Sequence, residues 1–363
     1  MKIFLITFFL IYSIINLYVY ECINRAFPLT AIYKLLIILF MFIMIAGIYI
    51  VHGEFLKGDL LRLFAFICYY YLGFIFLLFS GLIIYDLISL VINFVNLKIS
   101  HNYVFIGILF ITVVIFIYGY FEANNIRIKH IKIKSNKVER NIKIAYISDM
   151  HLGILTLHQR VDKVYKMLKK LKPHVIIAGG DFVDGQHNNL EKYIISLENL
   201  EADYGKYAVL GNHEYYAGKD YSEGLIKSAG FTLLNNSSIS INDLNLTITG
   251  IEDIVNDPSE ELKLLKRNYD SKSFIIYVKH RPVINSEITN YFNLQLSGHT
   301  HNGQIFPFGL LVKMFFKYTS GLYKINEKAS LYVSNGTLTW GPPIRVLANP
   351  EITFITIDRI NSY

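Results

Sequence analysis

Cysteine is almost absent from this chain. It has 363 residues and only two cysteines, Cys22 and Cys68. Both lie in the first third, so the rest of the chain can form neither a disulfide framework nor a thiolate metal site. This distribution fits a reducing compartment.

Three common catalytic signatures are also missing. The chain has no G-x-x-x-x-G-K-[ST] loop, so nucleotide binding of that kind is not predicted. It has no G-x-S-x-G nucleophile elbow. A segment beginning at His213 and Glu214 starts like the zinc-protease motif H-E-x-x-H, but Ala217 occupies the last position.

Apolar residues, by contrast, are unusually common. Hydrophobic residues make up 53% of the chain and aromatic residues 15%, which is too apolar for an ordinary soluble protein. Nearly all of the excess precedes residue 120, in four runs long enough to cross a bilayer, which takes about 20 residues. The runs cover residues 3–20, 30–51, 60–95 and 104–120. We therefore expect residues 1–120 to form a transmembrane bundle of about four helices and residues 121–363 to form a separate domain.

The third run allows two interpretations. It is either one helix that continues along a surface or two spans that are broken near Gly81 and Asp86. An ionisable residue at membrane depth is a candidate functional residue. The alternative for Asp86 is a position at a helix end or interface, and the sequence does not decide between the two.

Basic residues predict the orientation in the membrane. The net charge is +7, and a basic cluster directly follows the last apolar run. The cluster consists of Arg127, Lys129, Lys132, Lys134, Lys137 and Arg140. Beside a span, such a cluster is first a topology signal, so we expect no nucleic acid partner. With four spans, both the N-terminus and the C-terminal domain are expected on the cytoplasmic side of the cell membrane.

Beyond residue 121 the pattern becomes that of an α/β domain. Alternating Ile and Lys or Arg residues at 126–134 predict a strand with one wet face. Short apolar runs at 142–148, 175–178, 207–210, 244–249, 274–278 and 294–297 predict further strands. Helical periodicity at 161–171 and 190–200 separates some of them, and this alternation indicates an α/β fold.

Polar residues gather where these strands end, which is where open α/β sheets usually bind ligands. The sequences are DMH at 149–151, GDFVD at 180–184, GNHE at 211–214, His280, and GHTH at 298–301. Taken singly, most of them are ordinary turns or structural histidines. Their occurrence together, each at a strand end, predicts a metal site.

This set of motifs resembles the calcineurin-like metallophosphoesterase superfamily, over residues 142–357. The signature of that superfamily is D-x-H, G-D-x-x-D, G-N-H-[DE], a lone His and G-H-x-H, and no ligand position departs from it here. The segments ISDMHLG, GHTHNGQ and GPPIRVLANPEITFI look like a bacterial branch of membrane-associated phosphohydrolases that includes a UDP-2,3-diacylglucosamine hydrolase. Asn302 stands where that branch commonly has Gly.

The resemblance implies two facing mixed β-sheets flanked by helices and a centre of two divalent metal ions. It assigns Asp149, His151 and His301 to the first ion and Asn212, His280 and His299 to the second. Asp181 would bridge the two ions. Oxygen and imidazole ligands without thiolates suit Mn, Fe or Zn.

His213 is left over from this ligand set. The resemblance implies that it reaches the leaving-group oxygen as a general acid, a role suited to a histidine titrating near neutral pH. Glu214 beside it would orient or polarise the ring. Asp184 would brace the loop by hydrogen bonding.

The substrate is predicted mainly from location. Residues 305–316 (IFPFGLLVKMFF) follow the last ligands and form either a buried strand or loop, or an apolar lip that touches a lipid tail or the bilayer. In the second case Lys313, Lys317 and Arg345 would meet a head-group phosphate. We expect hydrolysis of a phosphoester or pyrophosphate of a membrane lipid or lipid-linked nucleotide. The alternatives are a tethered general or cyclic-nucleotide phosphodiesterase, and a non-catalytic membrane scaffold with structural metals.

Overall fold

The computed structural model describes residues 2–52, 58–92, 100–185, 190–253 and 257–360. The chain divides into two compact units. The first, which we call the helical unit, comprises Met1–Phe121 together with Gly341–Val346. The second comprises Glu122–Trp340 and Leu347–Tyr363, and we call it the phosphoesterase unit after the superfamily that its motifs resemble.

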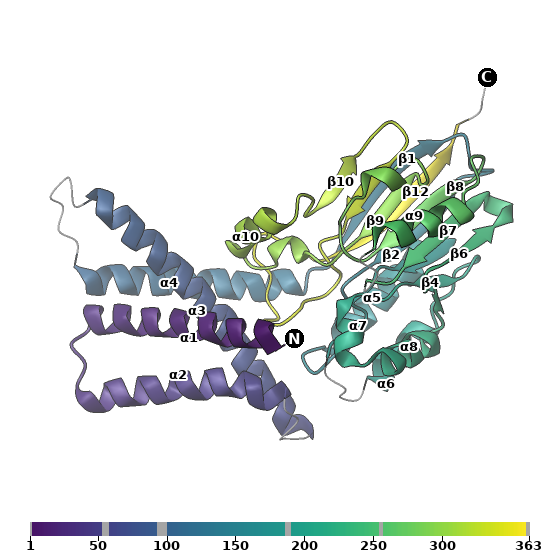
Figure 1. The fold of residues 1–363 in the computed structure, drawn as a ribbon. Coiled ribbons are helices and arrows are strands. Elements are labelled where there is room, and N and C mark those ends of the chain that lie inside the picture. Colours follow the sequence, from purple (N-terminus) through teal and green to yellow (C-terminus); the bar gives the residue numbers. More distant parts are fainter. Residues whose placement is uncertain (1, 53–57, 93–99, 186–189, 254–256, 361–363) are drawn as a thin grey trace. The chain divides into compact units, whose positions relative to one another are not determined.

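The helical unit contains the four helices that the apolar runs predict (Figure 1). They are α1 (Lys2–Ala26), α2 (Ala31–His52), α3 (Gly58–Ile92) and α4 (His101–Ala123). Each is long and apolar enough to cross a membrane, and many of their large apolar side chains are exposed. Exposed apolar surface of this extent is expected of helices that face lipid.

The third apolar run forms one continuous helix over its described residues, so it is not broken near Gly81. At about 1.5 Å per residue, the 35 residues of α3 exceed the roughly 30 Å of a hydrocarbon core. Asp86 lies near the end of α3, where Tyr18 donates a hydrogen bond to its carboxylate at 2.7 Å and Arg25 pairs with it at 3.1 Å. These contacts favour the helix-interface interpretation, in which Asp86 ties α3 to α1.

The phosphoesterase unit is built around two mixed six-stranded sheets, as the resemblance implied (Figure 1). The first sheet has the order β1-β12-β2-β3-β4-β5 and the second the order β10-β11-β9-β8-β7-β6. The strands of the first sheet are β1 (Arg127–Ser135), β2 (Ile142–Ile147), β3 (Val175–Ala178), β4 (Lys206–Ala208), β5 (Thr232–Leu233) and β12 (Glu351–Arg359). Those of the second are β6 (Ser237–Ile241), β7 (Leu246–Ile251), β8 (Phe274–Lys279), β9 (Leu294–Ser297), β10 (Gly321–Lys324) and β11 (Ser330–Val333).

Helices cover the outer faces of both sheets. The α-helices are α5 (His158–Leu171), α6 (Glu191–Glu198), α7 (Asn212–Ala217), α8 (Lys219–Ser228), α9 (Pro258–Arg267) and α10 (Phe308–Phe315). Short 3₁₀ turns are η2 (Asn242–Leu244), η3 (Ser286–Ile288) and η4 (His301–Gly303). Apolar residues of α5, α6 and α8 pack on the first sheet, and α9 packs on the second.

The central strands are buried on both faces, which explains why their sequences are apolar throughout rather than alternating. In β2, Ile142 and Ile144 point into the core between the sheets, whereas Ala145 and Ile147 point towards the helices. The pairs β2–β3, β3–β4 and β8–β9 are all parallel. Within each sheet these strands therefore end at the same edge.

Two C-terminal segments bear on the predicted contact with lipid. Residues 341–346 pack with the helical unit, where the Arg345 amide donates to the carbonyl of Gly119 at 2.9 Å. Arg345 is fully buried, so the expectation that it meets a head-group phosphate is wrong. Residues 305–316 form no buried strand either, because their main element is α10, a helix without a buried residue.

Candidate metal centre

The polar residues singled out in the sequence follow five strands at the edges of the two sheets. Asp149 and Asp181 follow β2 and β3, and Asn212 begins α7 just after β4. From the second sheet, His280 follows β8, and the pair His299 and His301 follows β9. The loops after β2 and β3 run side by side, because His151 donates its backbone N–H to the carbonyl of Asp181 at 2.9 Å.

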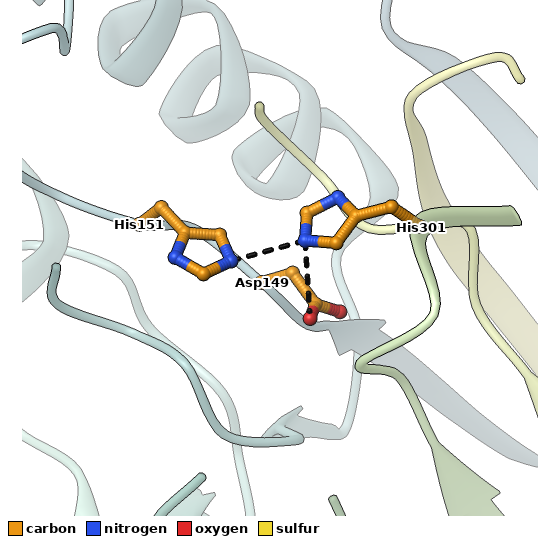
Figure 2. Close-up of side chains that lie close together, drawn as sticks. All are labelled: Asp149, His151 and His301. Atoms are coloured by element: carbon orange, nitrogen blue, oxygen red, sulfur yellow. Dashed lines mark hydrogen bonds and ion pairs between the residues drawn. The ribbon is translucent and has the colours of Figure 1, made fainter. Parts of the chain in front are cut away.

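One cluster consists of Asp149, His151 and His301, and all three are buried (Figure 2). The Nε2 atoms of the two histidines face one another at 3.0 Å. His301 Nε2 lies 3.5 Å from the Asp149 carboxylate. Two ring nitrogens and a carboxylate oxygen thus converge, in the combination that the resemblance assigns to the first metal ion.

A second cluster consists of Asp181, His280 and His299. His280 Nε2 lies 3.0 Å from Oδ2 of Asp181 and 3.2 Å from Nδ1 of His299. The same Asp181 oxygen lies 3.8 Å from Nε2 of His151, which belongs to the first cluster. Asp181 therefore faces both clusters, which is the position that a bridging carboxylate requires.

Asn212 supplies an independent test of whether a metal ion fits. Its side-chain oxygen is buried and has no hydrogen-bond partner among the described residues. An unsatisfied buried acceptor costs about 1–3 kcal/mol, so it calls for a missing partner. A divalent cation would satisfy an amide oxygen in this position, and the surrounding oxygen and imidazole donors suit such an ion.

The backbone around the clusters is held in an uncommon conformation. Five of the predicted ligands have positive φ angles, between 42° and 71°: Asp149, His151, Asp181, His299 and His301. Non-glycine residues rarely adopt this region, and such strain gathers at functional sites. Asn302 also has a φ of 50°, which asparagine tolerates better than most residues and which explains why it can replace glycine there.

Two glycines of the motifs are required by close packing. A Cβ atom at Gly211 would collide with the Asp181 carboxylate. One at Gly298 would collide with Ser148 and with the Asp149 carboxylate. The glycines in G-N-H and G-H-x-H therefore leave space for the ligands.

Electrostatics favour cation binding. Asp149 and Asp181 are no more than 2% exposed, and buried carboxylates are normally paired or bound to metal. Burial lowers the pKa of His151 to about 3, and the charge of His213 acts in the same direction. Burial also lowers the pKa of His299 to about 3, helped by the charge of His280. These two imidazoles are therefore neutral at pH 7 and offer lone pairs to a metal ion.

His213 stands beside the clusters with a different set of partners. Its Nδ1 lies 3.0 Å from the Asp184 carboxylate, and its ring makes an edge-on contact with His151 at 4.6 Å between centroids. Burial lowers the pKa of His213, but the charge of Asp181 and the hydrogen bond with Asp184 outweigh it and raise the pKa to about 9. A protonated histidine at this point is suited to donate a proton.

The Glu214 side chain makes no hydrogen bond with the His213 ring among the described residues, although its charge helps to raise the pKa of His213. Its carboxylate is fully buried and accepts backbone hydrogen bonds from Asp181 at 3.0 Å, Val183 at 3.0 Å and Gly211 at 2.6 Å. These bonds hold the G-D and G-N turns together. Asp184, expected only to brace its loop, is the carboxylate that contacts the ring, and it also accepts from the amide of Gly185.

Two aromatic side chains at the site were not foreseen. Tyr216 and Trp340 contact the His213 ring at centroid distances of 5.3 and 5.6 Å, and both are more than a third exposed. Tyr216 lies on α7 with His213, three residues away, which is the spacing of neighbours on a helix surface. Trp340 is distant in the sequence, and no local pattern indicates it.

Comparison with known proteins agrees with this geometry. A family model described as calcineurin-like phosphoesterase matches residues 142–303. An uncharacterized metallophosphoesterase of Aquifex aeolicus is 36% identical over 258 residues, which cover 69% of this chain and 98% of that protein. A Helicobacter pylori metallophosphoesterase, also uncharacterized, is 33% identical over 64% of each chain. A transmembrane protein with metallophosphoesterase domain from Danio rerio is 28% identical over 69% of this chain and 62% of that protein.

This chain thus spans somewhat less than two thirds of the Helicobacter pylori and Danio rerio proteins. It aligns with nearly the whole of the Aquifex aeolicus protein. The residues that match the family model, 142–303, include every predicted metal ligand from Asp149 to His301. The chain belongs to the calcineurin-like phosphoesterase family.

Proposed function

We propose that this chain hydrolyses a phosphoester or pyrophosphate of a membrane lipid or lipid-linked nucleotide, at a centre of two divalent metal ions. The observation that carries the proposal is the position of Asp181, which faces His280 at 3.0 Å and His151 at 3.8 Å and so can serve both ligand clusters. When bound, two such ions clamp the phosphoryl oxygens and lower the pKa of water enough to supply a nucleophile near neutral pH.

The protein's own residues divide the remaining work. Asp149, His151 and His301 would hold one ion, and Asp181 would contact both. Asn212, His280 and His299 would hold the other ion. His213 donates its Nδ1 proton to a hydrogen bond with Asp184, which leaves Nε2 to protonate the leaving-group oxygen as the phosphorus–oxygen bond breaks.

The membrane substrate is supported by the architecture. The four long apolar helices would keep residues 121–363, the proposed catalytic domain, beside lipid, and residues 1–120 would act as the anchor. The basic cluster that begins in β1 supports a cytoplasmic location for this domain. Reporter fusions at the C-terminus would test the location, and a signal from the opposite side of the membrane would overturn it.

Replacement of His213 by alanine tests the catalytic assignment. We expect full-length His213→Ala to retain its bound metal and to lose about 10²–10⁴ in turnover, the usual contribution of a general acid. His158→Ala is a matched control, because His158 is an exposed histidine on α5 that pairs with Asp162. Undiminished turnover in His213→Ala would show that His213 is not the acid.

The substrate class needs a separate assay. Metal-reconstituted full-length protein would be given a diacylglucosamine nucleotide in vesicles and, in parallel, small soluble phosphodiesters. We expect turnover of the lipid-linked compound. Turnover of the soluble esters alone would rule out the lipid substrate and favour a tethered general phosphodiesterase.

A further inference from the structure

Helix α10 exposes an apolar surface that nothing in the phosphoesterase unit covers over its described residues. Leu310 and Leu311 are 56% and 48% exposed, and Met314 and Phe315 are 77% and 81% exposed. Residues four positions apart stack on one side of a helix, so Leu310 with Met314 and Leu311 with Phe315 form two adjoining rows of one broad face. An exposed apolar cluster of this kind marks an interaction site.

The opposite side of α10 is fixed to the metal centre. Gly309 packs so closely on Asn302 and Gly303 that a Cβ atom at Gly309 would lie 3.0 Å from the Asn302 carbonyl oxygen. Asn302 and Gly303 belong to the 3₁₀ turn η4, which begins at the predicted ligand His301. Phe316, directly after the helix, contacts the ring of His299 at 5.3 Å between centroids. The apolar face therefore belongs to an element that is held against two of the predicted ligands.

The charges around α10 complement an anionic lipid surface. Residues 305–326 contain no aspartate or glutamate, and Lys313 and Lys317 are exposed. Each basic residue near an anionic membrane adds to the electrostatic attraction. The same chain carries four helices long and apolar enough to cross a bilayer, and a helix tethered to such spans meets lipid at a raised effective concentration.

We propose that α10 is an interfacial helix that lies in the plane of the membrane. Leu310, Leu311, Met314 and Phe315 enter the acyl region, and Lys313 and Lys317 contact anionic head groups, as in other amphipathic interfacial helices. The metal centre beside it would then receive phosphoesters that remain in the membrane. The lipid contact is independent of catalysis, whereas this consequence for the substrate rests on the function proposed above.

Spin labelling tests the lipid contact without an activity assay. Cys22 and Cys68 would be replaced by alanine, and a nitroxide attached at Met314→Cys in full-length protein held in nanodiscs of phosphatidylcholine and phosphatidylglycerol. Ile195→Cys is the matched control, because Ile195 is a 61% exposed apolar residue on α6. We expect the label at 314 to collide mainly with lipid-soluble oxygen and the label at 195 mainly with a water-soluble nickel chelate.

Two results would overturn the proposal. A label at 314 as accessible to the nickel chelate as the label at 195 would place α10 in water. A label at 314 that is shielded from both reagents would show that a protein or a second copy of this chain covers the face instead.

A paired variant tests the consequence for the substrate. We expect the double variant Met314→Glu, Phe315→Glu to lower the ratio of vesicle-ester to soluble-ester turnover on the order of tenfold, because it places charges where acyl chains should lie. Ile195→Glu should leave that ratio unchanged. An unchanged ratio in the double variant would overturn the role of α10 in substrate access, and loss of all turnover in the unmutated protein would overturn the proposed function instead.

Discussion

Asp86 of the helical unit and three acidic residues at the candidate metal centre of the phosphoesterase unit are placed in opposite ways. In the helical unit, Asp86 lies near a helix end, and its side chain and that of its partner Arg25 are 36% and 47% exposed. In the phosphoesterase unit, Asp149, Asp181 and Glu214 are at most 2% exposed. A buried carboxylate is costly unless it is paired, hydrogen-bonded or bound to a metal ion. Asp86 therefore ties two helices together, whereas Asp149 and Asp181 lie in the candidate metal centre and Glu214 holds its turns in place.

The largest expected difference is between two equivalent substitutions, one in each unit. Asp181→Asn should lower turnover by on the order of 10³-fold or more and weaken binding of both ions, exceeding the ~10–100-fold effect of groups that only support ligands. Asp86→Asn should change turnover of a soluble ester by no more than about twofold, because an exposed pair contributes ~0–1 kcal/mol. Unchanged metal content in Asp181→Asn would remove Asp181 from the bridging role, and a large loss in Asp86→Asn would break the contrast between the units.

Glu214 is a buried carboxylate of the phosphoesterase unit that we expect to stabilise the fold. Glu214→Ala leaves three buried backbone N–H groups without their acceptor, at about 1–3 kcal/mol each, so we expect the phosphoesterase unit to unfold several kcal/mol more easily. Fluorescence of Trp340, the only tryptophan of the chain, reports this unfolding. His213→Ala should unfold like the unmutated protein. If Glu214→Ala has native stability but no activity, Glu214 takes part in catalysis after all.

Asp184 should affect the pH dependence of turnover. The hydrogen bond and charge of Asp184 help to raise the pKa of His213 to about 9. A general acid works only when protonated, so the rate should fall as pH rises through this pKa. Asp184→Asn removes the charge, so the rate should begin to fall at a lower pH than in the unmutated protein. In acidic buffer, where His213 is protonated in both proteins, the two rates should differ less. Asp162→Asn on α5 is the control, and an identical pH profile for Asp184→Asn would show that Asp184 does not act on His213.

Much of the metal centre could be predicted because its residues lie at the ends of recognisable strands. The apolar runs that end before Asp149, Asp181 and His280 identify parallel strands, and parallel strands of one sheet end at one edge. Asp149 and Asp181 follow neighbouring parallel strands of the first sheet. His280 follows β8 of the second sheet, so its approach to Asp181 at 3.0 Å depends on how the two sheets face each other.

Other features depend on tertiary packing that a local pattern does not contain. Glu214 follows His213 directly, yet its side chain turns into the core, because the backbone N–H groups of two neighbouring turns need an acceptor there. The last strand, β12, lies between β1 and β2 in the first sheet, so residues from opposite ends of the domain's sequence become neighbours. The apolar stretch at 305–316 has no polar residue before Lys313, so its sequence did not separate a buried strand from the exposed helix α10.

Metal content measured together with activity tests the central claim most directly. Full-length protein would be stripped with a chelator, reloaded with Mn, Fe or Zn, and analysed for bound metal and for hydrolysis of a soluble phosphodiester. Because Asp181 of the second cluster also faces His151 of the first, we predict about two ions per chain, activity lost on chelation and activity restored on reloading. Full activity in protein that contains no bound metal would contradict a dinuclear centre.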